Sequence, residues 1–180
     1  MKKLFFAVLA ISAMMMTACK PSEEPEKTQT KKVTAHCAIA NDIDKYFDLD
    51  IKCTIDGQAV DTKGLFTSLE KVTDEAILLR AGDDKDRMFE YNGELEVELA
   101  PGVSSKKIKM VVTFHRNKNV VLEKEYLMAY ALFARTGEEA VFGEEIFSLK
   151  HFNCETEEDA AASLDTFDGT VIETEWVVKR

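Results

Sequence analysis

Residues 93–99 have the sequence Gly93-Glu94-Leu95-Glu96-Val97-Glu98-Leu99, in which acidic and aliphatic side chains alternate from Glu94 onward. Successive side chains of a β-strand point to opposite faces, so the three glutamates fall on one face and the aliphatic side chains on the other. The pair Pro101-Gly102 follows, which is typical of a turn. The stretch therefore predicts a half-buried strand that ends at a turn.

Two other stretches show the same period of two residues. Residues 46–55 separate a polar face from a face formed by Phe47, Leu49, Ile51, Cys53 and Ile55. Residues 170–178 place Ile172, Thr174, Trp176 and Val178 on one face. Both stretches predict strands, and we expect the second to close the fold with Trp176 in the core.

Residues 106–122 predict a β-hairpin. Ile108, Met110, Val112 and Phe114 recur at every second position and share one side, and Val120-Val121-Leu122 form a second apolar stretch. Four polar residues at 116–119, two of them asparagines, separate the two stretches. Such a connection is typical of a turn between paired strands.

Three segments carry helix signals. Residues 68–80 are compatible with a helix and residues 123–135 are rich in helix formers, and the sequence does not decide between helix and strand in either. Thr156, followed by Asp159 and three alanines, predicts a short capped helix. The chain as a whole predicts a mainly β fold: an antiparallel β-sandwich with one or two short helices, for which an immunoglobulin-like arrangement is one candidate.

Residues 93–127 loosely resemble the small immunoglobulin-like FxLYD-type domains of bacterial envelope proteins. Where that family places its signature, this chain has Val112-Thr113-Phe114-His115-Arg116, without the Tyr and Asp. The resemblance covers about a fifth of the chain. It implies a sandwich topology and no specific ligand.

The N-terminus has the layout of an export signal. Two lysines precede thirteen residues, 4–16, of which Ser12 alone is polar. As a helix, thirteen residues rise about 20 Å, which is short of the roughly 30 Å hydrocarbon core of a bilayer. We therefore expect residues 1–18 to be a signal peptide rather than a transmembrane helix.

The end of this signal, Met16-Thr17-Ala18-Cys19, resembles the lipobox of bacterial lipoproteins. The resemblance implies that a peptidase cuts before Cys19 once its thiol carries a diacylglycerol, and that acyl chains such as palmitate then hold the protein on the membrane. Lys20 stands where an Asp retains lipoproteins at the inner membrane in enterobacteria-like systems. The outer membrane is therefore the favoured location. The alternative is an ordinary secretory signal that happens to contain a cysteine.

The rest of the chain divides into a tether and one domain. Residues 19–32 contain no large apolar side chain and two of the three prolines, so we expect a lipidated cysteine and a flexible tether. Residues 33–180 have the size of a single domain and carry 17 basic and 30 acidic side chains, a net charge of −13. This excess of acidic groups argues against nucleic acid as a partner.

Three cysteines remain beyond Cys19: Cys37, Cys53 and Cys154. In an oxidising compartment a disulfide is expected, and Cys37 and Cys53 are the favoured pair because they fall on consecutive predicted strands. The bond would close a loop of about 15 residues and contribute roughly 3 kcal/mol. Sequence does not give the connectivity, so Cys154 paired with either of the other two stays open.

Four residues form the sharpest metal hypothesis: His36, Cys37, His151 and Cys154 would suit zinc or copper. However, neighbours on a strand point to opposite faces, so His36 and Cys37 do not easily share an ion. Asp42, Asp44, Asp48 and Asp50 suggest calcium, but their stretch lacks the central glycine and terminal glutamate of an EF-hand loop, and Asp48 and Asp50 fall on the outward face of a predicted strand. We expect no metal and no cofactor.

Recognised catalytic motifs such as the serine-hydrolase elbow, the zinc-protease helix and the phosphate-binding loop are missing from the sequence. We therefore assign no catalytic residue. The favoured function is a membrane-anchored envelope lipoprotein that binds a protein or glycan partner without catalysis. The alternative is a small metal-binding or hydrolytic envelope lipoprotein.

Overall fold

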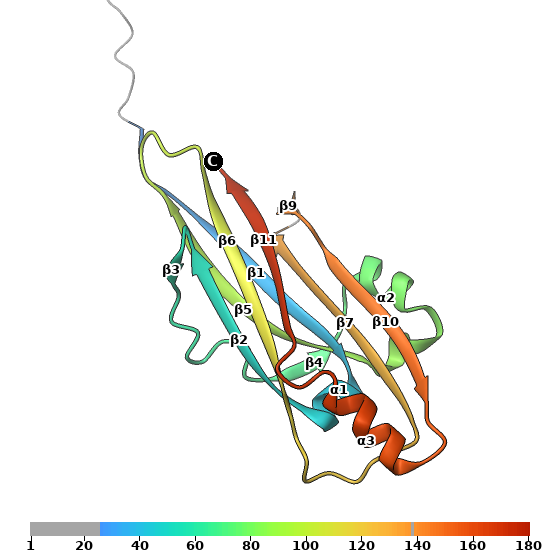
Figure 1. Ribbon diagram of the computed structural model, residues 1–180. Helices are drawn as coiled ribbons and strands as arrows, with labels where there is room; N and C mark the ends of the chain where they lie inside the picture. Colours follow the sequence, from blue (N-terminus) through green and yellow to red (C-terminus); the bar gives the residue numbers. More distant parts are fainter. Residues whose placement is uncertain (1–25, 138) are drawn as a thin grey trace, which may run out of the picture.

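The computed structural model describes residues 26–137 and 139–180, which form two packed antiparallel sheets (Figure 1). The fold is therefore a mainly β sandwich, as the alternating stretches predict. The expected signal peptide, the lipidated Cys19 and the tether up to residue 25 lie outside the described residues. No helix in the described part of the chain is both long and apolar enough to cross a membrane.

The first sheet is built around the long strands β1, β5 and β7. Its order is β10 (Ile146–Asn153), β7 (Glu125–Thr136), β1 (Gln29–Ala40), β5 (Met88–Leu99) and β4 (Leu69–Lys71), and β8 (Glu139–Ala140) also pairs with β7. The second sheet has the order β3 (Gln58–Ala59), β2 (Phe47–Ile55), β6 (Ser105–Arg116), β11 (Val171–Lys179) and β9 (Phe142–Gly143). Consecutive strands β1 and β2 therefore belong to different sheets.

Short helices connect or cover the sheets. They are α1 (Asn41–Tyr46), α2 (Glu75–Ala81), α3 (Glu157–Asp165) and the 3₁₀ helix η1 (Gly82–Arg87). The predicted cap of the last α-helix is confirmed: the Thr156 hydroxyl accepts from the Asp159 amide at 3.1 Å, and the Asp159 carboxylate accepts from the Thr156 amide at 3.2 Å. The described residues thus contain three α-helices, whereas one or two short helices were expected from the sequence.

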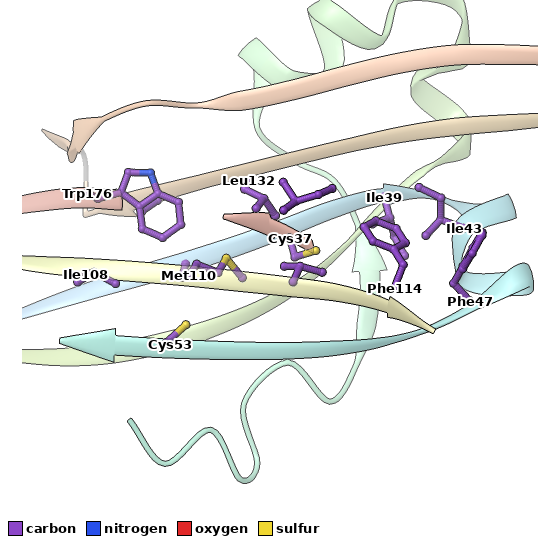
Figure 2. Close-up of a cluster of buried hydrophobic side chains, with 14 of the residues drawn as sticks. Cys37, Ile39, Ile43, Phe47, Cys53, Ile108, Met110, Phe114, Leu132 and Trp176 are labelled. Carbon is purple, nitrogen blue, oxygen red and sulfur yellow. The ribbon is translucent and has the colours of Figure 1, made fainter. Parts of the chain in front are cut away.

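The main core lies between the two sheets. On β5, Leu95, Val97 and Leu99 are buried while the glutamates between them are exposed, which confirms the alternation. On β11, Trp176 is 1 % exposed and lies in the core, as predicted. Figure 2 shows side chains from both sheets meeting there, among them Trp176, Met110 and Leu132.

A second apolar cluster lies on the opposite face of the first sheet, where α2 packs. Ile77 and Ala81 of α2 join Leu127, Ala129 and other buried side chains there. Strand β7 is therefore buried on both faces: Tyr126 and Met128 face the inter-sheet core, and Leu127 and Ala129 face α2. A strand covered on both sides has no polar face, which explains why residues 123–135 lack the period of two residues.

The predicted hairpin at residues 106–122 is wrong. β6 pairs with β2 and β11, and Val120–Leu122 form no strand. Instead the chain leaves the second sheet after Arg116 and enters the first as β7. The polar residues at 116–119 therefore begin a crossing between sheets. The undecided segment 68–80 contains both elements, β4 and α2, separated by three residues.

The predicted tether is also too long by four residues. β1 begins at Gln29, and Gln29–Lys32 pair with Leu99–Glu96 of β5. The long partner strand supplies backbone hydrogen-bond partners even where the side chains are polar. The domain therefore starts at residue 29 rather than 33.

Candidate functional site

A cleft of about 470 Å³ lies where the two sheets are bridged by the segment that follows β3. One side is formed by α1 and by residues 47–51 of β2. The other is formed by Leu65, Phe66 and Thr67, together with Tyr91 of β5. The cleft combines apolar and acidic side chains.

The β2 side of the cleft is an unpaired sheet edge. β2 pairs with β6 along its whole length, but with β3 only at Thr54 and Ile55. The Cys53 carbonyl accepts from the Val60 amide at 2.9 Å, which shows that its backbone groups point away from β6. Backbone direction alternates along an antiparallel strand, so the N–H and C=O groups of Leu49 and Ile51 also point to this edge. In the described residues, no strand pairs with them on that side.

The opposite wall is held in place by Phe66. Its backbone has φ = 55°, a left-handed conformation that is rare for a bulky residue, and its amide donates to the Asn92 carbonyl at 3.0 Å. The ring packs on Gly93 of β5: a Cβ at that position would lie 2.8 Å from Phe66 Cζ. Gly93 therefore allows the wall to approach the sheet.

We expect Gly93→Ala to destabilise the protein by about 1–3 kcal/mol, because the new methyl group displaces the Phe66 ring. The cost should shrink when Gly93→Ala is made in a Phe66→Ala background, where the ring is gone. Thermal denaturation of the two single variants and the double variant measures this coupling. Equal costs in both backgrounds would show that Phe66 does not rest on Gly93.

The cleft is acidic. Asp44, Asp48 and Asp50 line it, and no Lys or Arg is among its described lining residues. The Tyr91 hydroxyl donates to Asp44 Oδ1 at 2.6 Å. Burial raises the pKa of Tyr91, and the hydrogen bond to Asp44 raises it further, so the phenol stays protonated as a donor. Asp50 also pairs with Lys52, which lies outside the cleft and is 70 % exposed.

The cysteines favoured for a disulfide, Cys37 and Cys53, are both free thiols in the structure. They lie on facing sheets rather than on adjacent strands of one sheet, and both enter the buried core (Figure 2). Burial raises the pKa of each thiol to about 12, and for Cys37 the nearby Cys53 raises it further. Cys154 is also free and is only partly buried.

We expect Cys154 to react first with iodoacetamide, and Cys37 and Cys53 to react only after unfolding. A thiol with a pKa of about 12 holds almost no thiolate at pH 8, and thiolate is the reactive form. The unfolded chain ionises near pH 9, so these two thiols stabilise the fold below pH 9 and that contribution is lost as the pH rises towards 12. Mass spectrometry of the protein alkylated in its native and in its denatured state shows which of the three thiols have reacted. Protection of both thiols even in denaturant would instead show the disulfide expected from the sequence.

The four metal candidates are not brought together. His36 Nδ1 lies 2.9 Å from Glu90 Oε2 and the His36 ring stacks on Phe133, on the sheet face opposite the Cys37 thiol. His151 Nε2 lies 2.9 Å from Asp84 Oδ2. Across the described residues, no three His, Cys, Asp or Glu side chains are grouped as metal ligands.

Asp42, one of the acidic residues of the calcium hypothesis, is a buried carboxylate, and nothing in the sequence indicates its burial. It is 7 % exposed, and its Oδ2 accepts from the Leu127 amide and from Arg87 Nη2, each at 2.6 Å. These bonds join α1 to β7 and to η1. Asp42 is structural: it positions α1, which carries Asp44 into the cleft.

The cleft residues were also missed as a group. The alternation at residues 46–55 predicts which β2 side chains face inward, but Phe66 and Tyr91 reach the cleft from distant parts of the chain. A positive φ at Phe66 cannot be foreseen from a non-glycine residue. Comparisons with protein-family models, curated proteins and solved structures found no match for this chain.

Proposed function

We propose that this protein is a lipoprotein of the bacterial cell envelope, held on the membrane by acyl chains on Cys19. The export signal at residues 1–18 and the lipobox-like end at Cys19 support the anchor. Lys20 favours the outer membrane over the inner one. Because β1 begins at Gln29, nine residues separate Cys19 from the sandwich, and nine residues span at most about 30 Å. The domain then works close to the membrane surface.

The sandwich acts as a non-enzymatic binding module. The observation that carries this proposal is the cleft beside β2, where an unpaired strand edge meets apolar and acidic side chains. Exposed strand edges attract other chains unless they are blocked, so a strand edge inside a cleft is suited to a partner. A protein partner is favoured over a glycan because the edge presents backbone donors and acceptors in strand register.

Site-specific photo-crosslinking in living cells tests the binding function. A photoreactive residue at Thr67, which is exposed and lines the cleft, should give discrete crosslinked species. The matched control is Glu173 on β11, exposed on the same sheet but outside the cleft. Equal patterns from both positions, or no product from Thr67, would contradict a binding function for the cleft.

A further inference from the structure

We propose that the cleft binds an extended protein segment rich in basic side chains, which pairs with β2 as an added strand. This inference rests on the proposed binding function and specifies its partner. Three features of the cleft carry it: the backbone groups of the β2 edge, the apolar side chains beside them, and the sign of the charge.

The β2 edge has room for a short strand. The Phe47 amide donates to the Ile43 carbonyl and the Cys53 carbonyl accepts from the Val60 amide, so the free stretch of the edge is Asp48 to Lys52, which lacks a strand partner on the cleft side among the described residues. Five residues at about 3.3 Å each give roughly 16 Å of edge. β3 already pairs with β2 at Thr54 and Ile55, so an added segment would continue the ladder from the point where β3 ends.

The apolar part of the cleft suits every second side chain of such a segment. Leu49 and Ile51 are half-buried on the β2 side, and Leu65 and Phe66 are half-buried across from them. Side chains of a strand alternate between faces, so those pointing inward would contact this apolar surface. Phe66 is held by its bond to Asn92 and by its packing on Gly93, so this wall is already formed in the free protein.

The charge of the cleft selects a basic occupant. Asp44, Asp48 and Asp50 lie along it. A second copy of this chain would bring the same three carboxylates to the same edge, so pairing of two β2 edges is disfavoured by like-charge repulsion. Lys52, which pairs with Asp50, is exposed and can be displaced by an incoming cation.

The first test uses two fluorescent ten-residue peptides, one of alternating Lys and Val and one of alternating Glu and Val, with the full-length protein in mild detergent. Fluorescence anisotropy should show binding of the Lys peptide and no binding of the Glu peptide. The variant Asp48→Asn/Asp50→Asn should weaken binding of the Lys peptide about tenfold. The control Glu173→Gln/Glu175→Gln, which removes two exposed charges from β11 of the same sheet, should leave it unchanged.

The second test separates strand addition from simple ion pairing. Two further Lys–Val peptides carry N-methyl groups, on all the Val residues in one and on all the Lys residues in the other. An added strand bonds to β2 through alternate residues, so one of the two peptides should lose binding and the other should keep it. Amide hydrogen exchange of Leu49 and Ile51 should also slow when the unmethylated peptide binds.

Each outcome bears on the proposal. Binding by both methylated peptides, or equal binding of the Lys and Glu peptides, overturns strand addition by a basic segment. If no peptide binds while Thr67 still crosslinks to a partner in cells, strand addition is overturned and the binding function stands. If Thr67 does not crosslink either, both are overturned.

Discussion

Replacement of Trp176 by alanine is expected to lower the free energy of unfolding by about 3–5 kcal/mol. Trp176 is the largest fully buried side chain among the described residues and is 1 % exposed, so its removal leaves a cavity between the two sheets (Figure 2). Its strand, β11, lies between β6 and the short edge strand β9 in the second sheet, and Trp176 pairs with Gly143 of β9. Urea denaturation followed by circular dichroism measures the loss, since Trp176 is the single tryptophan that fluorescence would report.

Two controls belong with this variant. Trp176→Phe keeps an aromatic ring and removes the indole Nε1–H, which has no hydrogen-bond partner among the described residues, so its cost should be smaller. Val171→Ala, on the same strand but 55 % exposed, should change stability by no more than about 0.5 kcal/mol. A Trp176→Ala effect as small as that of Val171→Ala would contradict the placement of Trp176 in the core.

Replacement of Asp42 by alanine is expected to cost about 2–3 kcal/mol, because it leaves the Leu127 amide buried without an acceptor. The Arg87 side chain is 38 % exposed, so water screens its attraction to Asp42. The ion pair therefore contributes less to stability than the hydrogen bond from the Leu127 amide. Thermal or chemical denaturation measures the change.

The matched controls are Asp44→Ala and Asp42→Asn. Asp44 lies on the same helix but is exposed, so its replacement should cost much less than that of Asp42. Asp42→Asn keeps a carbonyl oxygen that can accept from the Leu127 amide, so its effect should fall between the two. Similar costs for Asp42→Ala and Asp44→Ala would show that the buried carboxylate does not hold α1 to β7.

The sequence predicts the half-buried strands well and the fully buried strand poorly. β5 and β11 each have one polar face, so their period of two residues is visible in the chain. One face of β7 packs against α2 and the opposite face packs against the second sheet, so its residues are apolar on both faces. Its composition is rich in helix formers, so the sequence alone does not identify it as a strand. The hairpin predicted at residues 106–122 is wrong for a related reason: sheet membership depends on long-range packing. Val120–Leu122 have the apolar composition of a strand but form none.

The candidate site was less predictable than the fold. Asp48 and Asp50 were expected on the outward face of a strand, but no local signal shows that the edge of that strand is unpaired. Edge status depends on where β3 stops pairing and where the following segment crosses to the first sheet. The same holds for Cys37 and Cys53, whose consecutive strands separate into different sheets because α1 turns the chain between them.

The proposed membrane anchor of this sandwich is the lipidated Cys19. Mass spectrometry of the mature protein tests this anchor most directly. The bond after Lys20 precedes a proline and resists trypsin, so the N-terminal tryptic peptide should run from Cys19 to Lys27. We predict that this peptide begins at Cys19 and carries a diacylglyceryl group on the thiol. A mature protein that begins at another residue, or an unmodified Cys19, would contradict the claim.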